Sequence, residues 1–130
     1  MAHRHEEQLI QLTQKLLDCI AAGDWTTYQE LCDPSLTAFE PEARGVLVHG
    51  LPFHKYYFDL EKQPSPTRTT IVAPHVRSVG TDAAVVSFIR LVQHVASDGT
   101  PVTARFEETR VWQRREGQWR HVHFHRSSNS

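Results

Sequence analysis

The chain has 130 residues, 39% of them hydrophobic and 22% charged, which is typical of one globular domain. Its 14 basic and 15 acidic residues give a net charge of −1, which argues against nucleic acid or an anionic membrane as a partner. No apolar run is long enough for a membrane span or a signal peptide. The two cysteines, Cys19 and Cys32, form no disulfide framework or metal motif, so we expect buried free thiols and a cytoplasmic protein.

The first half of the chain is predicted to hold three helices. Residues 6–22 repeat leucine and isoleucine at helical spacing, with acidic residues at the start and Gly23 at the end. Asp24 is expected to cap a second, short helix that ends at Asp33–Pro34. Short strands are expected at 35–40 and 46–48, and Pro52 belongs to the first turn of a third helix, 51–60.

From residue 68 the hydrophobic period changes to two, which predicts strands at 68–79, 83–96, 102–114 and 118–126. Pro74 interrupts the first of these strands and indicates a bulge or an edge position. Asp98–Gly99 and the turn at 115–118 predict hairpins. Helices followed by a four-stranded antiparallel meander predict an α+β fold, with the sheet curled as a cone around the long first helix.

Three arginines stand at positions where the alternation predicts core residues. Arg90, Arg110 and Arg126 lie on consecutive strands, which are about 5 Å apart, so we expect the guanidinium groups to converge inside the concave face. Unpartnered there, each would cost several kcal/mol. Two explanations remain open: internal pairing with carboxylates such as Glu108 or Glu40, or binding of a carboxylate ligand.

Histidines form the second unusual group. His121, His123 and His125 are expected on one face of the last strand, exposed to solvent or at an interface. Such an array can hold a metal, but the sequence places no acidic or cysteine ligand beside it, so we expect no metal and no cofactor. His54, in FHKYYF, is expected to be a satisfied core group. The sequence contains no phosphate loop, nucleophile elbow or zinc motif, and no catalytic residue is predicted.

Five segments of the chain resemble the association, or hub, domain of calcium/calmodulin-dependent protein kinase II. They are CDPSLTAFEPEARGVLVHG (32–50), FHKYYF (53–58), TTIVAPHV (69–76), FIRLVQ (88–93) and EETRVWQRREGQWRHVHFHRS (107–127). The resemblance covers residues 6–127 of a single domain spanning 1–130, and 107–127 is its most specific part. It implies a cystatin-like α+β cone, related to the nuclear-transport-factor and ketosteroid-isomerase folds.

The resemblance also implies self-association. Hub domains form two stacked rings of roughly six or seven subunits each, so a dodecamer, a tetradecamer or a larger homo-oligomer is expected. In the full kinase this scaffold clusters catalytic domains, which then phosphorylate one another at high effective concentration. The sequence contains no kinase domain and no calmodulin-binding segment, so it is either part of a kinase or a free-standing hub-like protein, and not an enzyme.

In hub domains of animal kinases, arginines from three strands and a histidine of the FH motif line a cavity that binds small carboxylates. Arg90, Arg110, Arg126 and His54 match these four positions. Tyr28 matches a tyrosine on the cavity wall. The resemblance therefore implies a carboxylate site at these five residues.

Two other functions are alternatives to this one. A cavity enzyme of the ketosteroid-isomerase type needs a general base and an oxyanion donor, and His54 with Arg110 would have no obvious cavity carboxylate beside them. An adaptor would bind peptides with acidic termini through the same arginines. The chain also departs from the family after FHKYYF, where Leu60, Glu61 and two prolines replace a longer segment that often carries a tryptophan.

Overall fold

The computed structural model describes residues 2–60 and 67–128, with the backbone alone for residues 2–4. The shortened segment after FHKYYF therefore lies mostly outside the described residues. In chain order the elements are α1 (Ala2–Ala22), α2 (Trp25–Leu31), β1 (Cys32–Phe39), the 3-10 helix η1 (Pro41–Ala43), β2 (Val48–His49), α3 (Pro52–Asp59), β3 (Arg68–Ser78), β4 (Ala83–Val95), β5 (Pro101–Arg115) and β6 (Gln118–Ser128).

The two N-terminal helices form where the sequence predicts them, but α1 begins earlier. It starts at Ala2, so Glu6 lies inside the helix, and the expected acidic first turn is wrong. Gly23 ends α1 in a left-handed conformation, with φ of 71°, which glycine adopts without steric cost. The carboxylate of Asp24 accepts a hydrogen bond from the backbone N–H of Thr27 at 3.1 Å and caps α2, as predicted.

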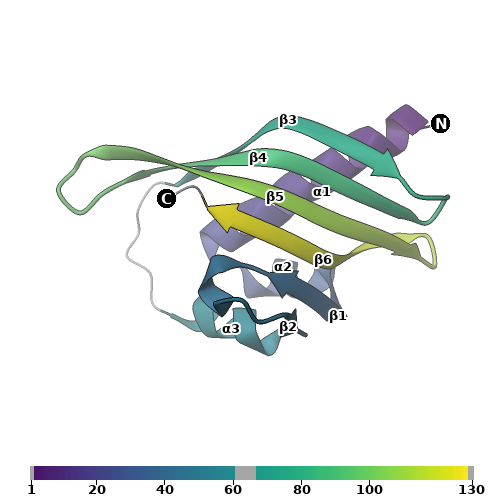
Figure 1. The fold of residues 1–130 in the computed structure, drawn as a ribbon, viewed down its shortest axis with the longest axis horizontal. Helices are drawn as coiled ribbons and strands as arrows, with labels where there is room; N and C mark the ends of the chain where they lie inside the picture. The colour runs from purple at the N-terminus through teal and green to yellow at the C-terminus, as the bar shows by residue number, and fades with distance from the viewer. Residues whose placement is uncertain (1, 61–66, 129–130) are drawn as a thin grey trace.

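A curled, open sheet of six strands replaces the predicted sheet of four. The meander β3 to β6 is confirmed, but β1 pairs in parallel with β6 and antiparallel with β2, giving the order β2-β1-β6-β5-β4-β3. β1 starts at Cys32, three residues earlier than expected, and β2 is Val48–His49 instead of 46–48. Because β1 runs parallel to β6, the segment that follows β1 lies at the end of the sheet where β6 ends (Figure 1).

The irregular positions of the meander agree with the sequence. Pro74 lies in the edge strand β3, beside a bulge between Val72 and His75 where Ala73 has φ of 51°. The turn between β5 and β6 has φ of 52° at Glu116 and 76° at Gly117, the two positive values of a tight type I′ hairpin.

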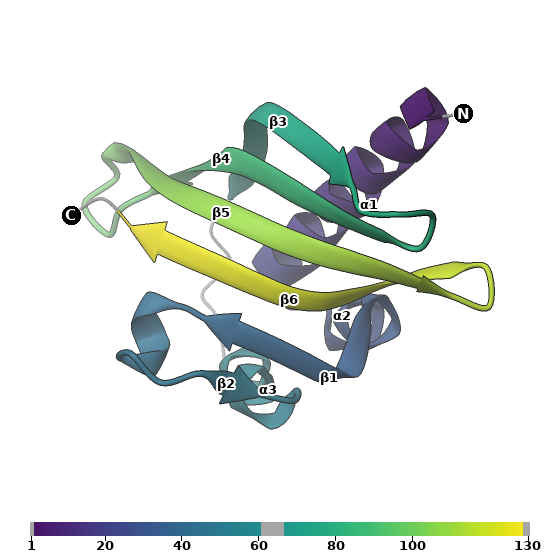
Figure 2. The same cartoon turned by 45° about the vertical axis from the view of Figure 1, so that its right-hand side comes forward.

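Helices α1, α2 and α3 lie on one face of the sheet, and no helix of the described residues lies on the other face (Figure 2). The core fills the space between helices and sheet, and Trp112 is its largest fully buried side chain. The indole N–H of Trp112 donates to Thr13 Oγ1 at 3.1 Å, and this hydroxyl donates to the carbonyl of Leu9 at 2.8 Å. Among the described residues, no helix is long and apolar enough to cross a membrane.

A bulge in β6 separates the three histidines that were expected on one face. His123 pairs with Val111 and His121 pairs with Trp112, so Val122 is the extra residue of β6. His121 is therefore fully buried between Trp112 and Phe124, with ring centroids 5.2 Å and 5.7 Å away. The prediction that His121 faces solvent or an interface is wrong. His125 is exposed and His123 is half-buried.

Candidate functional site

A cavity of about 240 Å³ lies between the helices and the inner face of the sheet. It brings together all five residues that the sequence nominated, which come from five different elements. The residues that line it are Ile20, Tyr28, Glu40, Glu42, His54, Tyr57, Phe58, Arg90, Arg110, Phe124 and Arg126.

Strand alternation places the arginines. Arg90 and Arg110 share the inner faces of β4 and β5 with Phe88 and Trp112. Arg126 follows Phe124 by two residues on β6, beyond the bulge, and so points inward as well. The predicted convergence on the concave face is confirmed.

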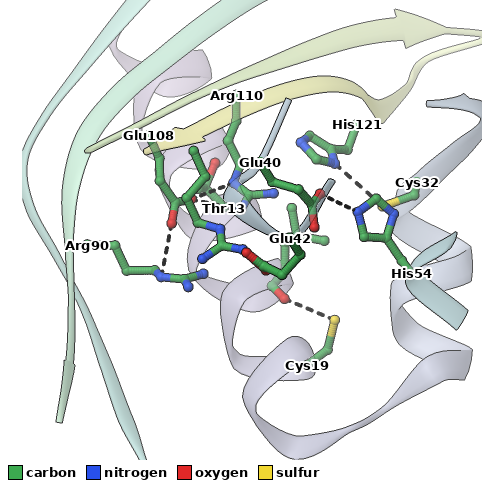
Figure 3. Close-up of polar contacts among 12 residues, drawn as sticks. Thr13, Cys19, Cys32, Glu40, Glu42, His54, Arg90, Glu108, Arg110 and His121 are labelled. Carbon is green, nitrogen blue, oxygen red and sulfur yellow. Dashed lines mark hydrogen bonds and ion pairs between the residues drawn. The ribbon is translucent and has the colours of Figure 1, made fainter. Parts of the chain in front are cut away.

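Glu108 is the counter-ion of two of the arginines. Its Oε1 accepts a hydrogen bond from Arg110 Nε at 2.9 Å and lies 2.7 Å from Arg110 Nη2. Its Oε2 lies 2.9 Å from Arg90 Nε, an ion pair whose angles fall outside those of a hydrogen bond. Figure 3 shows the two arginines approaching this carboxylate from different strands. Since the Glu108 side chain is 0% exposed, the cluster is shielded from water.

The cluster leaves one buried guanidinium nitrogen with neither a hydrogen bond nor an ion pair among the described residues. Arg110 Nη1 is buried and has no hydrogen-bond partner among the described residues, while the guanidinium carbon lies 4.2 Å from the centroid of the Phe124 ring. Burial lowers the pKa of Arg90 to about 10; Glu108 opposes this shift, and the charges of Arg110 and Arg126 add to it. Arg90 therefore remains cationic at neutral pH.

A histidine–carboxylate pair forms another wall of the cavity. Nε2 of His54, on α3, lies 2.6 Å from Glu40 Oε2, while His54 Nδ1 is buried without a partner among the described residues. His54 is thus buried as predicted but only half satisfied. The Tyr28 ring packs 6.0 Å from His54, and burial raises the pKa of Tyr28 far above its usual value, so its hydroxyl stays neutral.

Arg126 pairs with a third carboxylate. Its Nη2 donates to Glu42, which lies on η1, and the guanidinium carbon is 5.1 Å from the centroid of the Phe106 ring. Arg90 lies against the same ring at 4.9 Å, so Phe106 contacts two guanidinium groups.

The structure thus shows internal pairing: each of the three arginines contacts a carboxylate. Glu108 does pair with Arg110, as weighed, but Glu40 contacts His54 and not an arginine. The sequence offered no obvious cavity carboxylate as a base beside His54 and Arg110, whereas the structure places Glu40 against His54 and Glu108 against Arg110. Sequence reasoning did not nominate Glu42 at all. The segment FEPEARG, at the end of β1, contains Glu42 two residues after Glu40, which could have indicated a second carboxylate. Only the pairing of β1 with β6 brings that segment to Arg126.

Outside the cavity, the described residues offer no group of three His, Cys, Asp or Glu side chains able to hold a metal ion. Cys19 and Cys32 are free and buried, as expected. Cys32 Sγ lies 3.5 Å from His121 Nδ1, and burial raises the pKa of each thiol to about 12. Neither thiol is therefore a nucleophile in the native fold.

The family model for the calcium/calmodulin dependent protein kinase II association domain matches residues 5–130. The chain belongs to this family. The delta subunit of calcium/calmodulin-dependent protein kinase type II from Oryctolagus cuniculus is 49% identical over 126 residues, which are 95% of this chain and 24% of that subunit. The association domain described here thus spans about a quarter of that relative's length, and the kinase domain is absent from it.

Solved structures of the family have the same fold. The hub homology domain of Chlamydomonas reinhardtii is 50% identical, with a TM-score of 0.89 and coverage of 94% of this chain and 96% of that one. The association domain of the kinase from C. elegans is 40% identical, with a TM-score of 0.92 and coverage of 97% of both chains.

More distant structures confirm the predicted fold class. A protein with a cystatin-like fold from Caulobacter vibrioides is 17% identical, with a TM-score of 0.71 and coverage of 97% and 91%. A nuclear transport factor 2-like protein from Salmonella enterica is 19% identical, with a TM-score of 0.77 and coverage of 100% and 94%. At such identities the likeness concerns the fold alone.

Proposed function

We propose that this association domain is a non-catalytic scaffold that assembles with copies of itself into a closed double ring of a dozen or more subunits. Membership of the association-domain family carries the proposal. In a complete kinase chain, such an assembly would hold catalytic domains close together in the cytoplasm and raise their effective concentration.

The helix-free face of the sheet supports self-association. Its central strands carry Val85, Ile89, Leu91 and Val111, which are only half-buried in the single chain. Phe39, on β1, is 39% exposed on the same face. A sheet face that presents half-buried apolar side chains without a covering helix among the described residues is the kind of surface that obligate assembly buries, at more than about 2,000 Å² per interface.

The native mass tests the scaffold. Light scattering or native mass spectrometry across a concentration series should give a complex of a dozen or more subunits that persists on dilution, and its mass fixes the ring number. A monomer or a simple dimer at every concentration would refute the scaffold.

The second part of the proposed function is binding of a small carboxylate in the cavity. Its support is the convergence of five predicted residues on one cavity, together with the unpartnered Arg110 Nη1. A guanidinium nitrogen buried without a partner is costly, and a two-pronged carboxylate satisfies it well.

Arg126 is the better target for a binding test. Its partner Glu42 is 36% exposed in the side chain and can turn to water when Arg126 is lost, whereas removal of the fully buried Arg110 would disturb Glu108. We expect Arg126→Ala to abolish binding of butyrate in calorimetry and Arg105→Ala, an exposed arginine of β5, to retain it. Unchanged binding by Arg126→Ala would refute the site.

A further inference from the structure

The three carboxylates of the site are not equivalent. Glu108 is 0% exposed in its side chain and contacts two arginines, and Glu40 is 4% exposed and contacts His54. The Glu42 side chain is 36% exposed, and its hydrogen bond among the described residues is to Arg126 alone. Glu42 is therefore the one that can leave the site with least disturbance.

The backbone that carries Glu42 does not depend on its side chain. The backbone N–H groups of Ala43 and Arg44 donate to the carbonyls of Glu40 and Pro41, at 3.1 Å and 3.2 Å, and these bonds define the turn η1. The side chain can therefore rotate into water while η1 stays as it is. What opposes this rotation is one partly exposed ion pair, and pairs of this kind favour the closed state by about two- to fivefold.

Charge balance makes this rotation relevant to binding. The site holds three arginines and three carboxylates, so a further anion would leave uncompensated negative charge among largely buried side chains. Release of Glu42 into solvent restores the balance and frees the Nη2 group of Arg126. Arg110, whose buried Nη1 has no hydrogen-bond partner among the described residues, lines the same cavity.

We infer that the Glu42 carboxylate occupies the place on Arg126 that a ligand carboxylate takes, and that the cavity binds its ligand by exchanging one carboxylate for the other. This inference rests on the proposed carboxylate function. Glu42 is then a tethered competitor, and the apparent dissociation constant equals the intrinsic constant divided by the fraction of molecules in which Glu42 has left Arg126.

The consequence is a gain of binding when Glu42 is neutralised. Glu42→Gln keeps the size of the side chain but removes the charge that competes for Arg126. We expect this variant to bind butyrate about two- to fivefold more tightly than the wild type, because the closed state that must be opened is no longer favoured.

The experiment is a calorimetric titration of acetate and butyrate at pH 7 into four purified proteins: wild type, Glu42→Gln, Glu40→Gln and Glu7→Gln. Glu7 is exposed on α1, about 20 Å along the helix from the cavity residue Ile20, and serves as the matched control for the loss of one charge. Glu40→Gln tests a carboxylate that lines the cavity but is held by His54 and cannot exchange. Native mass measured on each variant shows whether the assembly is intact.

Tighter binding by Glu42→Gln alone supports the exchange. If wild type binds butyrate and Glu42→Gln binds no more tightly, the exchange is refuted and the carboxylate site stands. An equal gain in Glu40→Gln also overturns the exchange, because the effect is then a general loss of negative charge. If neither wild type nor Glu42→Gln binds, the proposed carboxylate function fails and the exchange fails with it.

Discussion

Glu108→Gln is the substitution for which the structure predicts the largest effect. The side chain is fully buried and compensates both Arg90 and Arg110, at 2.9 Å and 2.7 Å. Removing one partner from a buried ion pair costs about 3–5 kcal/mol, because the charge left behind is neither hydrated nor compensated. A neutral amide at this position would leave two guanidinium groups without their counter-ion, so we expect a loss at the upper part of this range.

The loss is large enough for a simple assay. For a chain of this length, a free energy of unfolding lower by 1 kcal/mol reduces the melting temperature by roughly 3–5 °C, so a loss of about 4–5 kcal/mol should reduce it by roughly 12–25 °C. Thermal and urea unfolding should be compared at one protein concentration, because assembly couples stability to concentration.

Glu107→Gln is the matched control. Glu107 is the preceding residue of the same strand, but it is exposed on the helix-free face, so its loss should change the stability by less than about 0.5 kcal/mol. If Glu108→Gln also stays within about 1 kcal/mol of the wild type, the two arginines are not held by this carboxylate and the account of the cluster is wrong.

Three further predictions concern other parts of the molecule. Burial, with the nearby charges of Arg110 and His54, lowers the pKa of His121 far below 6.5. Only the unfolded chain then takes up this proton, so the free energy of unfolding should fall as the pH drops below about 6.5, by at most about 1.4 kcal/mol per pH unit. Urea unfolding at several pH values should show that this free energy depends less on pH in His121→Phe than in the wild type. Cys19 and Cys32 should not react with a thiol reagent at pH 8 until the protein unfolds; labelling of the native protein would contradict their burial. Ile89→Asp should lower the native mass and leave the circular dichroism spectrum intact, and an unchanged mass would place the subunit contacts elsewhere.

The sequence was most informative where structure is local. A period of two placed Arg90, Arg110 and Arg126 on one face because alternation along a strand is a property of the strand alone. The tight turn at Glu116 and Gly117 and the cap of α2 also depend only on neighbouring residues.

Pairing between distant segments could not be predicted in this way. The parallel pairing of β1 with β6 joins residues more than 80 positions apart, such as Ala38 and Phe124. No local pattern encodes it, and it alone brings Glu40 and Glu42 to the arginines. The sequence therefore predicted the cations of the site and named Glu108 and Glu40 as candidate partners, but it did not predict Glu42 or which carboxylate pairs with which cation.

The bulge at Val122 shows a second reason why the sequence did not predict every side-chain position. The segment HVHFHR alternates without interruption, so it predicts His121 on the outer face. One signal did argue against this: Trp119 and Phe124 are both large and apolar but five positions apart, and a regular strand cannot bury both. The extra residue resolves the conflict, and both side chains are buried at the expense of His121, which follows Trp119 into the core.

The charges of the cavity are hard to explain by stability. Replacing a buried ionic cluster with apolar residues of similar volume is often neutral or stabilising, so the cluster of Arg90, Glu108 and Arg110 is weak evidence for stability. The cluster also leaves Arg110 Nη1 unpartnered, an added cost that an apolar core would avoid. The anion proposed as the ligand of the cavity would offset this cost, because its carboxylate could satisfy the nitrogen. The partly exposed Glu42 fits this argument, because it balances the charge of the site while remaining free to leave it.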